Sequence, residues 1–529
     1  MLKILALALA LRLLMLGSVP PSLNWDEVSM GYTAYSVSET GSDEWGSHLP
    51  LFFRSYGEWK SAVYIYLLVP LIKLFGLSPF VVRLPSALLG VVSVYLIYQI
   101  AKRLYSHQVG LWAAFLMAVT PWSFFLSRPA FEANVALTLI LAGIHFFLRY
   151  NLESKIYLLI ASGVFFGLAP HTYNSPKLVV PLLVIYLVWS TKLYKNLKSI
   201  LLYLAILALF AFPILTNLVS GYSQARYNQV SILTDGKALD AFYHLRQTMP
   251  LPDPLDKLII NKGTFFAYQF VANFLSYFSP GFLVWQGGTH TQQSLPYHGV
   301  LYVSELVFVV LGVITLVRHK RSFLPFALIV LGLVPAAITR DPQHVLRASL
   351  AIPGFILLAG LGWEYLTLRQ FRYLKIVNWL LIIEISLYIL GYFFWYAPAY
   401  ARDWQYGYPQ VSAYLEEHGD EYDSIVVTKW YGEPQLFLAF YGQWDPVAYQ
   451  SDNRPNLRYQ ENGKMWLDQL DEYHLGKYTF KYLNWQEEER SSKTLYVGKA
   501  DDFYPDSNLK TTIYYPDGSV AFHIVQGDK

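Results

Sequence analysis

Two adjacent carboxylates follow the first long apolar segment of the chain. They are Asp26 and Glu27, in the stretch SLNWDEVSMG. A carboxylate can accept the proton of a hydroxyl group as that hydroxyl attacks a carbon centre, which is the task of a general base. The plainer interpretation is that both side chains cap a helix, because acidic residues are favoured in a first helical turn.

Basic side chains occur in other segments that border apolar runs. YGEWKSAVYIY supplies Glu58 and Lys60, VVRLPSALLG supplies Arg83, and ITRDPQHVLRASLAIPG supplies His344 and Arg347. Arginine and lysine bind phosphate and stabilise the charge that a phosphate gains when it leaves. Lys60, Arg83, His344 and Arg347 are therefore candidate phosphate ligands, although long basic side chains also reach lipid headgroups without any further role.

Further polar residues stand at the ends of apolar runs. LSRPAFEAN contains Arg128 and Glu132, and APHTYNSPK contains His171 and Tyr173. Ionisable groups near lipid are costly and often functional, so Glu132 is a further candidate site residue. Arg128, His171 and Tyr173, together with Glu58, are candidate substrate contacts, with structural loop residues as the alternative.

The whole chain has the composition of a membrane protein. Its 529 residues are 54% hydrophobic and only 15% charged, so apolar content is above and charge below the averages of soluble domains. The net charge of +3 and the placement of basic residues at the ends of apolar runs predict no nucleic-acid partner. Cysteine is absent, which excludes disulfides, Cys-ligated zinc and thiol nucleophiles. We predict no required cofactor and no metal ligands, while the carboxylates stay compatible with a divalent ion.

Apolar runs suited to crossing a bilayer, which takes roughly 17–25 residues, recur along the first three quarters of the chain. About eleven are predicted, near residues 3–19, 82–101, 110–127, 134–149, 156–172, 176–191, 199–219, 299–317, 322–339, 349–367 and 375–396. The basic loops between them all fall on one side, which the positive-inside rule makes cytoplasmic. We therefore expect a multi-pass plasma membrane protein with a cytoplasmic N-terminus, in contact with membrane lipids.

Two apolar stretches could be something other than ordinary membrane spans. Residues 61–76 are short and contain Pro70 and Lys73, so we expect them to lie along the outer interface; counted as a span, they would reverse every later loop. The first run could be a signal peptide, but Arg12 interrupts it and no small-residue cleavage site follows. A retained anchor is expected.

The segment from residue 398 onward is polar. It contains a helical stretch at 409–418, strand-like SIVVT and TLYVG, and a hairpin in which TTIYY and VAFHIV flank Pro516-Asp517-Gly518. We therefore expect residues 1–397 to form a transmembrane domain with external loops 20–81 and 220–298, and residues 398–529 to form a small external α/β domain. The many tyrosines and tryptophans of that domain suit stacking on a glycan, an ordinary core or a membrane-facing surface, and the burial tendency of aromatic side chains favours the core.

These motifs together resemble the bacterial relatives of the protein O-mannosyltransferases and aminoarabinose transferases, which are polytopic glycosyltransferases with a C-type fold. The similar stretches are WDE, the Glu58–Lys60 element, GLSPFVVRLPSALLGVVSVYLIYQIAKRLY, SRPAFEAN, YFSPGFLVWQGG, HVLRASLAIPG and YGEPQLFLAFYGQWDPVAYQ. Their order and spacing carry the resemblance over most of the chain.

The resemblance implies an inverting transferase in the cell envelope that uses a polyprenyl-phosphate sugar as donor and a protein, lipid or glycan as acceptor. Asp26 then matches the general base, Glu132 a second acid, and Lys60, His344 and Arg347 the positions near the carrier phosphate. The chain departs from the family after Lys60, where Ser61-Ala62 replaces two prolines. The alternative is a transporter or flippase of a lipid-linked glycan, which predicts charges inside the spans and broken, repeated helices.

Overall fold

The computed structural model describes residues 1–528 apart from residues 56, 58, 220–229, 250–251 and 253–254. Contacts divide the chain into two compact units. The first, which we call the helical unit, is Met1–Leu13 with Ser86–Ile389. The second, the mixed unit, is Leu14–Pro85 with Leu390–Lys529. The later boundary lies close to the one expected at 397/398, and residues 20–81, predicted as an external loop, belong with the C-terminal segment.

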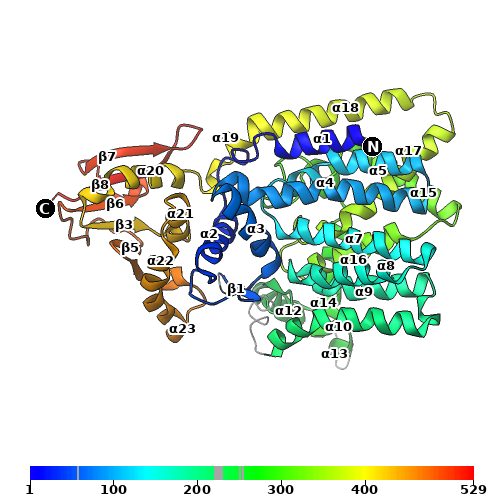
Figure 1. The fold of residues 1–529 in the computed structure, drawn as a ribbon, viewed down its shortest axis with the longest axis horizontal. Coiled ribbons are helices and arrows are strands. Elements are labelled where there is room, and N and C mark those ends of the chain that lie inside the picture. Colours follow the sequence, from blue (N-terminus) through cyan, green and yellow to red (C-terminus); the bar gives the residue numbers. More distant parts are fainter. Residues whose placement is uncertain (56, 58, 220–229, 250–251, 253–254, 529) are drawn as a thin grey trace. The chain divides into compact units, whose positions relative to one another are not determined.

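The helical unit consists mainly of apolar helices that run side by side (Figure 1). They are α1 (Leu2–Leu13), most of α4 (Pro79–Leu104), α5 (His107–Val119), α6 (Pro121–Leu126), α7 (Glu132–Glu153), α8 (Ile156–Leu168), α9 (Ser175–Ser190), α10 (Leu197–Val219), α15 (Val303–Arg318), α16 (Leu324–Ala337), α17 (Ile352–Leu368) and α18 (Leu374–Leu390). The predicted loop 220–298 adds α12 (Gly236–Thr248), α13 (Leu255–Ile259), α14 (Lys262–Ser276) and the π-helical η3 (Gly281–Trp285). Short 3₁₀ turns are η1 (Ala169–His171), η2 (Leu193–Lys195) and η4 (Ser349–Ala351).

Every predicted span contains a helix, and five stretches of the described chain are long and apolar enough to cross a membrane. These are Pro79–Leu104, Glu132–Glu153, Leu197–Asn217, Ser349–Leu368 and Leu374–Ala399. Others are shorter than expected for a local reason, as where α5 ends at Val119 because Pro121 starts a new helix and has no amide hydrogen for the old one. The count of eleven spans stays a prediction.

Close helix packing in the helical unit depends on small residues. A Cβ atom at Gly312 of α15 would collide with the carbonyl oxygen of Leu358, and one at Gly362 of α17 with that of Phe308. Helices without side chains at the contact approach until their backbones touch. α15 and α17 therefore form a rigid pair within this unit.

The mixed unit begins with α2 (Trp25–Thr40), the short strands β1 (Phe52–Arg54) and β2 (Trp59–Ser61), and α3 (Ala62–Phe75). α3 has 14 residues and is about 21 Å long, short of a hydrocarbon core of roughly 30 Å. This length agrees with an interfacial position, which stays a prediction. β1 pairs antiparallel with β2, and Phe53 lies opposite Lys60.

The C-terminal part of the mixed unit is an α/β arrangement, as expected. Its helices and turns are η5 (Gly391–Tyr396), α19 (Ala397–Ala399), η6 (Ala401–Trp404), α20 (Tyr408–His418), η7 (Gly419–Glu421), α21 (Pro434–Tyr441), α22 (Pro446–Asn453), η8 (Arg454–Leu457), α23 (Arg458–Glu461), η9 (Leu467–Gln469) and η10 (Ala500–Asp502). Its strands are β3 (Ser424–Thr428), β4 (Glu472–Leu475), β5 (Tyr478–Lys481), β6 (Thr494–Gly498), β7 (Asn508–Tyr514) and β8 (Val520–Gln526). The helix, both strands and the hairpin expected from the sequence are confirmed.

The six strands form one sheet in the order β4-β5-β3-β6-β8-β7. β3 is central and runs parallel to both β5 and β6, while the other pairs are antiparallel. Fully buried apolar side chains line β3, β6 and β8, namely Ile425, Val427, Leu495, Val497 and Ile524. The segments that follow β3, β5 and β6 therefore leave the sheet at the same edge.

Candidate active site

The first turn of α2 carries the candidate acids and is fixed by a capping box. Asn24 is the N-cap, and its side-chain oxygen accepts the amide hydrogen of Glu27 at 2.9 Å. In return the Glu27 carboxylate accepts the amide hydrogen of Asn24 at 3.1 Å. This reciprocal pattern satisfies two amide groups that a helix start leaves unpaired. Glu27 is thus tied to the helix start, whereas Asp26 beside it is not part of the box.

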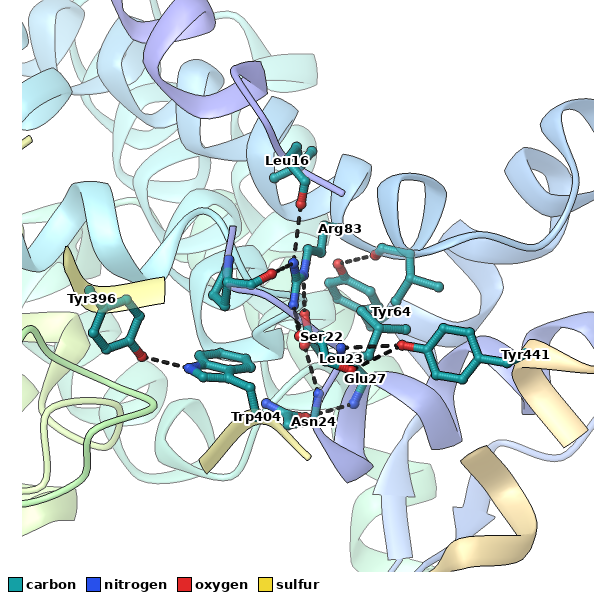
Figure 2. A network of polar contacts seen from close by, with 12 residues as sticks. Leu16, Ser22, Leu23, Asn24, Glu27, Tyr64, Arg83, Tyr396, Trp404 and Tyr441 are labelled. Atoms are coloured by element: carbon teal, nitrogen blue, oxygen red, sulfur yellow. Dashed lines mark hydrogen bonds and ion pairs between the residues drawn. The ribbon is translucent and has the colours of Figure 1, made fainter. Parts of the chain in front are cut away.

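Figure 2 shows that Glu27 also holds Arg83, which is fully buried. The guanidinium binds both carboxylate oxygens, at 2.8 Å from Nε and 3.0 Å from Nη2. Its remaining hydrogens go to the carbonyls of Leu16, Pro20 and Ser22. A guanidinium has five N–H donors, so these contacts use all of them. Arg83 therefore joins the chain before α2 to the start of α4.

Asp26 is paired with Lys60 within the mixed unit. Lys60 Nζ lies 3.0 Å from Asp26 Oδ1, and the two side chains differ sharply in exposure, at 6% for lysine and 51% for aspartate. The β1–β2 pairing sets the direction of Lys60, and Ser61 after it is the N-cap of α3. The Lys-Ser-Ala sequence therefore continues from a strand into a helix. The result is an ion pair between an accessible carboxylate and a buried ammonium group.

A group of buried acids near this pair was not found from the sequence. Glu44 accepts a hydrogen bond from Thr33 at 2.7 Å, and Glu433 accepts one from Gln435 at 2.5 Å. Asp468 accepts the amide hydrogen of Glu433 and the hydroxyl hydrogen of Tyr473, both at 2.6 Å. Glu44, Glu433 and Gln435 line a cavity of about 20 Å³, together with Ser29, Trp45, Arg54, Ser55, Leu436, Tyr449, Tyr459, Trp466 and Leu467. Glu433 lies in YGEPQLFLAFYGQWDPVAYQ, one of the stretches that carry the family resemblance, and this was the one sequence signal that pointed to any of these acids.

Burial changes the protonation of these acids. It raises the pKa of Glu44 to about 8, with a further rise from the Asp43 carboxylate. It also raises the pKa of Glu433 well above its usual range, reinforced by Asp468. The ammonium of Lys60 acts against both rises. Burial therefore favours the protonated forms of Glu44 and Glu433, whereas Asp26 is the accessible carboxylate that pairs with Lys60.

In the helical unit the structure brings His344 and Arg347 together. The amide hydrogen of Arg347 points to Nδ1 of His344 at 3.3 Å, and the guanidinium pairs with Asp341 at 3.0 Å. The backbone amide of His344 donates to the Tyr277 hydroxyl at 2.9 Å, and Ser175 donates to the Arg347 carbonyl. The two predicted phosphate ligands of the helical unit therefore lie on one turn that several hydrogen bonds hold. In this structure the partner of the Arg347 guanidinium is the Asp341 carboxylate.

Arg128 and Glu132 flank the start of α7. Arg128 is fully buried and donates to the carbonyls of Leu11 and Arg12, in the last turn of α1. A basic side chain at a helix C-terminus satisfies carbonyls that lack an amide partner. Glu132 is the first residue of α7, where the helix N-terminus favours a negative charge.

Two further predicted substrate contacts, His171 and Tyr173, lie shortly before α9, and a third, Glu58, is not described. His171 ends η1, and its Nε2 is 2.8 Å from the carbonyl oxygen of Phe210. Tyr173 is half-buried, two residues before α9 begins. Glu58, predicted as a substrate contact, lies outside the described residues. In the described part of the chain no three His, Asp or Glu side chains converge as a bound metal ion would need, so the expectation on metals stays a prediction.

Residues 60–219 match the family model of the dolichyl-phosphate-mannose-protein mannosyltransferases. No curated protein sequence matches the chain. Among solved structures it is similar to ArnT from Cupriavidus metallidurans in the apo state, with 12% identity, coverage of 100% of this chain and 99% of that one, and a TM-score of 0.57.

Two more structures are similar. ArnT from the same organism bound to undecaprenyl phosphate has 13% identity, the same coverage of 100% and 99%, and a TM-score of 0.55. The oligosaccharyltransferase of Archaeoglobus fulgidus, in complex with Zn and sulfate, has 13% identity, coverage of 83% of this chain and 61% of that one, and a TM-score of 0.50.

The fold is that of the C-type membrane glycosyltransferases, as expected from the sequence. The family match at residues 60–219 agrees with the expected resemblance to the protein mannosyltransferases. The similarity to the ArnT structures is a similarity of fold.

Proposed function

We propose that this chain transfers a sugar from a polyprenyl-phosphate carrier to a hydroxyl acceptor at the outer face of the plasma membrane, with Asp26 as general base. The observation that carries the proposal is the Asp26–Lys60 pair, an accessible carboxylate 3.0 Å from a buried ammonium group. One side chain can take a proton and the other can stabilise a departing phosphate. The family match and the carrier bound by ArnT support this donor class.

The proposed reaction is a single displacement. Asp26 accepts the proton of the acceptor hydroxyl as its oxygen bonds to the anomeric carbon, and the bond from that carbon to the phosphate oxygen breaks. The electron pair leaves with the carrier phosphate, whose added charge Lys60 stabilises. Lys60 then exchanges its carboxylate partner for phosphate during the reaction.

Inversion at the anomeric carbon is supported by the position of Glu27. A retaining transferase needs a second carboxylate as nucleophile, about 5 Å from the first. Glu27 is the neighbour of Asp26 in sequence, but both of its oxygens are held by Arg83. We therefore propose that Glu27 and Arg83 position the loop and do not contact the substrates, which revises the catalytic and phosphate-binding roles given to them from the sequence.

The roles of the helical-unit residues stay proposals. Arg347 and His344 are offered as carrier-phosphate ligands, with Asp341 as the partner that phosphate would displace. Arg128 is better explained as a cap of α1 than as a substrate contact, because it already binds the carbonyls of Leu11 and Arg12. Glu132, His171 and Tyr173 keep their predicted roles.

The test is Asp26→Asn in membranes supplied with radiolabelled undecaprenyl-phosphate sugars. A general base contributes roughly 10²–10⁴-fold to the rate, so we expect a loss of kcat of that size with little change in donor KM. Glu39→Gln, an exposed acid on the same helix, is the matched control. Turnover of Asp26→Asn within tenfold of wild type would reject the assignment.

The same preparation separates the transferase from a flippase. A transferase breaks the bond between sugar and carrier phosphate, so label leaves the lipid fraction. A flippase moves intact labelled lipid across the bilayer of reconstituted vesicles. Transbilayer movement without bond cleavage would favour the alternative.

A further inference from the structure

A wide cleft opens on the mixed unit beside the first residue of α2. It has a volume of about 610 Å³, within the range of roughly 300–1,000 Å³ that is usual for small-molecule sites. Its lining contains the aromatic side chains of Trp25, Trp430, Tyr431, Trp466 and Tyr482. Charged side chains, among them Lys464 and Asp471, complete the walls. The cleft is therefore rich in both flat rings and hydrogen-bonding groups.

The cleft lies next to the proposed general base. Trp25 lines it and directly precedes Asp26 in the first turn of α2. A Cβ atom on Gly432 would meet the Trp25 ring at 3.4 Å, so the turn of residues 429–432 packs closely against that ring. Gly432 has φ +79°, a conformation that glycine adopts without strain. The residue that carries the proposed base is therefore the direct neighbour of a residue in the cleft wall.

The cleft also has the position that α/β sheets commonly use for ligands. Lys429 and Trp430 follow the end of β3, Tyr482 follows β5, and Lys499 follows β6. These three strands are the parallel ones, with β3 in the centre. Ligands of open α/β sheets bind outside the carboxyl ends of such strands. Topology therefore indicates a binding site independently of the cleft's lining.

Two lysine side chains contact the walls of the cleft. The Lys429 ammonium donates to the backbone carbonyls of Asp468, Leu470 and Asp471. The Lys499 ammonium lies 3.8 Å from the centroid of the Trp430 ring. Despite these contacts, 58% of Trp430, 60% of Tyr482 and 40% of Trp25 are exposed. Large rings that face solvent at the walls of a cleft are suited to stacking on a ligand.

The lining fits a sugar. The C–H groups of a pyranose ring carry partial positive charge and pack against the negative face of an aromatic ring, while its hydroxyls bond to carboxylates and ammonium groups. A peptide is usually recognised by hydrogen bonds along a sheet edge or by apolar pockets. This cleft is formed by turns at strand ends, with rings beside charges, which favours a carbohydrate over a peptide.

We propose that this cleft binds the acceptor, and that the acceptor is the sugar unit of a glycan whose hydroxyl is presented to Asp26. The inference rests on the proposed transferase function and selects one of the three acceptor classes left open by the sequence. Trp430 and Tyr482 are the stacking residues, and Trp25 forms the wall next to the base.

The experiment measures binding and transfer separately on the full chain in detergent. Fluorescein-tagged oligosaccharides of hexose and N-acetylhexosamine are titrated without donor, and binding is followed by fluorescence anisotropy. The same oligosaccharides and a Ser/Thr-rich peptide are then offered as acceptors with radiolabelled undecaprenyl-phosphate sugars. The variants are Trp430→Ala, Tyr482→Ala and the conservative Trp430→Phe. Tyr514→Ala is the control, since Tyr514 on β7 is 56% exposed and lies outside the cleft lining.

We expect Trp430→Ala and Tyr482→Ala each to weaken oligosaccharide binding and raise acceptor KM about tenfold, the effect of losing one aromatic contact. Donor KM should not change, and Tyr514→Ala should behave like wild type. Trp430→Phe keeps an aromatic face, so it should lose less oligosaccharide binding than Trp430→Ala. Binding with no donor turnover would uphold the cleft and reject the proposed transferase. Donor turnover with label entering the peptide alone, or with unchanged acceptor binding in the cleft variants, would overturn the cleft as a sugar site.

Discussion

At the scale of single residues, three neighbouring carboxylates in the mixed unit have three different environments. Asp26 is accessible and paired with Lys60, Glu27 is buried and bound to Arg83, and Glu44 is buried beside Asp43. A buried charge is costly unless it is paired, and Arg83 supplies the partner of the buried Glu27. Asp26 is the acid that combines accessibility with a cationic partner, which suits it to exchange protons with a substrate.

The buried acid Glu44 makes stability depend on pH. Its pKa is raised from 4.5 to about 8 by burial and by Asp43, while Thr33 and Lys60 act in the opposite direction. The folded state then binds the proton more tightly than the unfolded chain, so this contribution is complete below pH 4.5 and is lost as pH rises through 8. The slope between these values is at most about 1.4 kcal/mol per pH unit.

Thermal unfolding of purified protein from pH 5 to pH 8 checks this expectation. Glu44→Gln keeps the hydrogen-bonding shape without a titrating group, so its Tm should fall less than that of wild type toward pH 8. Glu39→Gln, an exposed acid on α2, should follow wild type. Parallel curves for wild type and Glu44→Gln would mean that Glu44 titrates normally.

The Arg83–Glu27 pair should matter for stability. Arg83→Met leaves the Glu27 carboxylate buried without its cation, and such losses cost about 3–5 kcal/mol. We expect a large drop in Tm in detergent. The double variant Arg83→Met with Glu27→Leu removes both charges and should recover part of the drop. A single variant as stable as wild type would show that water or another group replaces the pair.

Part of the candidate site could be predicted from sequence because its signals are local. The WDE motif points to Asp26, and the Asn24-x-x-Glu27 spacing is itself a capping-box pattern that assigns Glu27 to the helix start. The buried partners could not be found in this way. Glu44 and Glu433 lie far apart in sequence, and only the fold brings them to one cavity.

At the scale of elements, the position of Asp26 depends on how α2 packs against α21. A Cβ atom on Gly31 would lie 2.5 Å from Phe440 Cε2 and 2.9 Å from Val82 Cγ2, and Phe440 is itself buried. The absence of a side chain at this position therefore lets α2 approach its neighbours.

Gly31→Val should disturb this packing. Overpacking a tight contact costs about 1–3 kcal/mol, which exceeds the gain of at most about 1 kcal/mol from replacing glycine in a helix. We expect a lower Tm and a lower kcat, because α2 carries Asp26. Glu39→Ala on the exposed side of the same helix is the control. An unchanged Tm for Gly31→Val would show that Phe440 moves aside freely.

Elements with a clear hydrophobic period could be predicted well. The apolar helices, β3, β6 and the β7–β8 hairpin were found because each carries its pattern within a few residues. α12 and α14 in the segment 220–298 were not, because their amphipathic sequences lack the length and apolarity of a span. Grouping of residues 14–85 with the C-terminal segment depends on long-range packing such as that of Gly31, which no local pattern reveals.

At the scale of the whole molecule, the proposed chemistry requires that the C-terminal domain and the first loop share the outer side of the membrane. The basic loops, such as Arg318-His319-Lys320-Arg321, predict which side stays in the cytoplasm, because positively charged loops are retained there. The sequence contains no cysteine, so a single introduced cysteine is a unique label.

His319→Cys and Asp517→Cys provide the two labels. His319 is exposed between α15 and α16, and Asp517 is exposed in the turn between β7 and β8. A membrane-impermeant maleimide should label Asp517→Cys in intact cells and His319→Cys only after permeabilisation. The reverse pattern would place the basic loops outside. Because Asp26 is predicted on the side opposite to the basic loops, it would then face the cytoplasm. The donor would have to be a carrier lipid whose sugar is displayed on the inner leaflet.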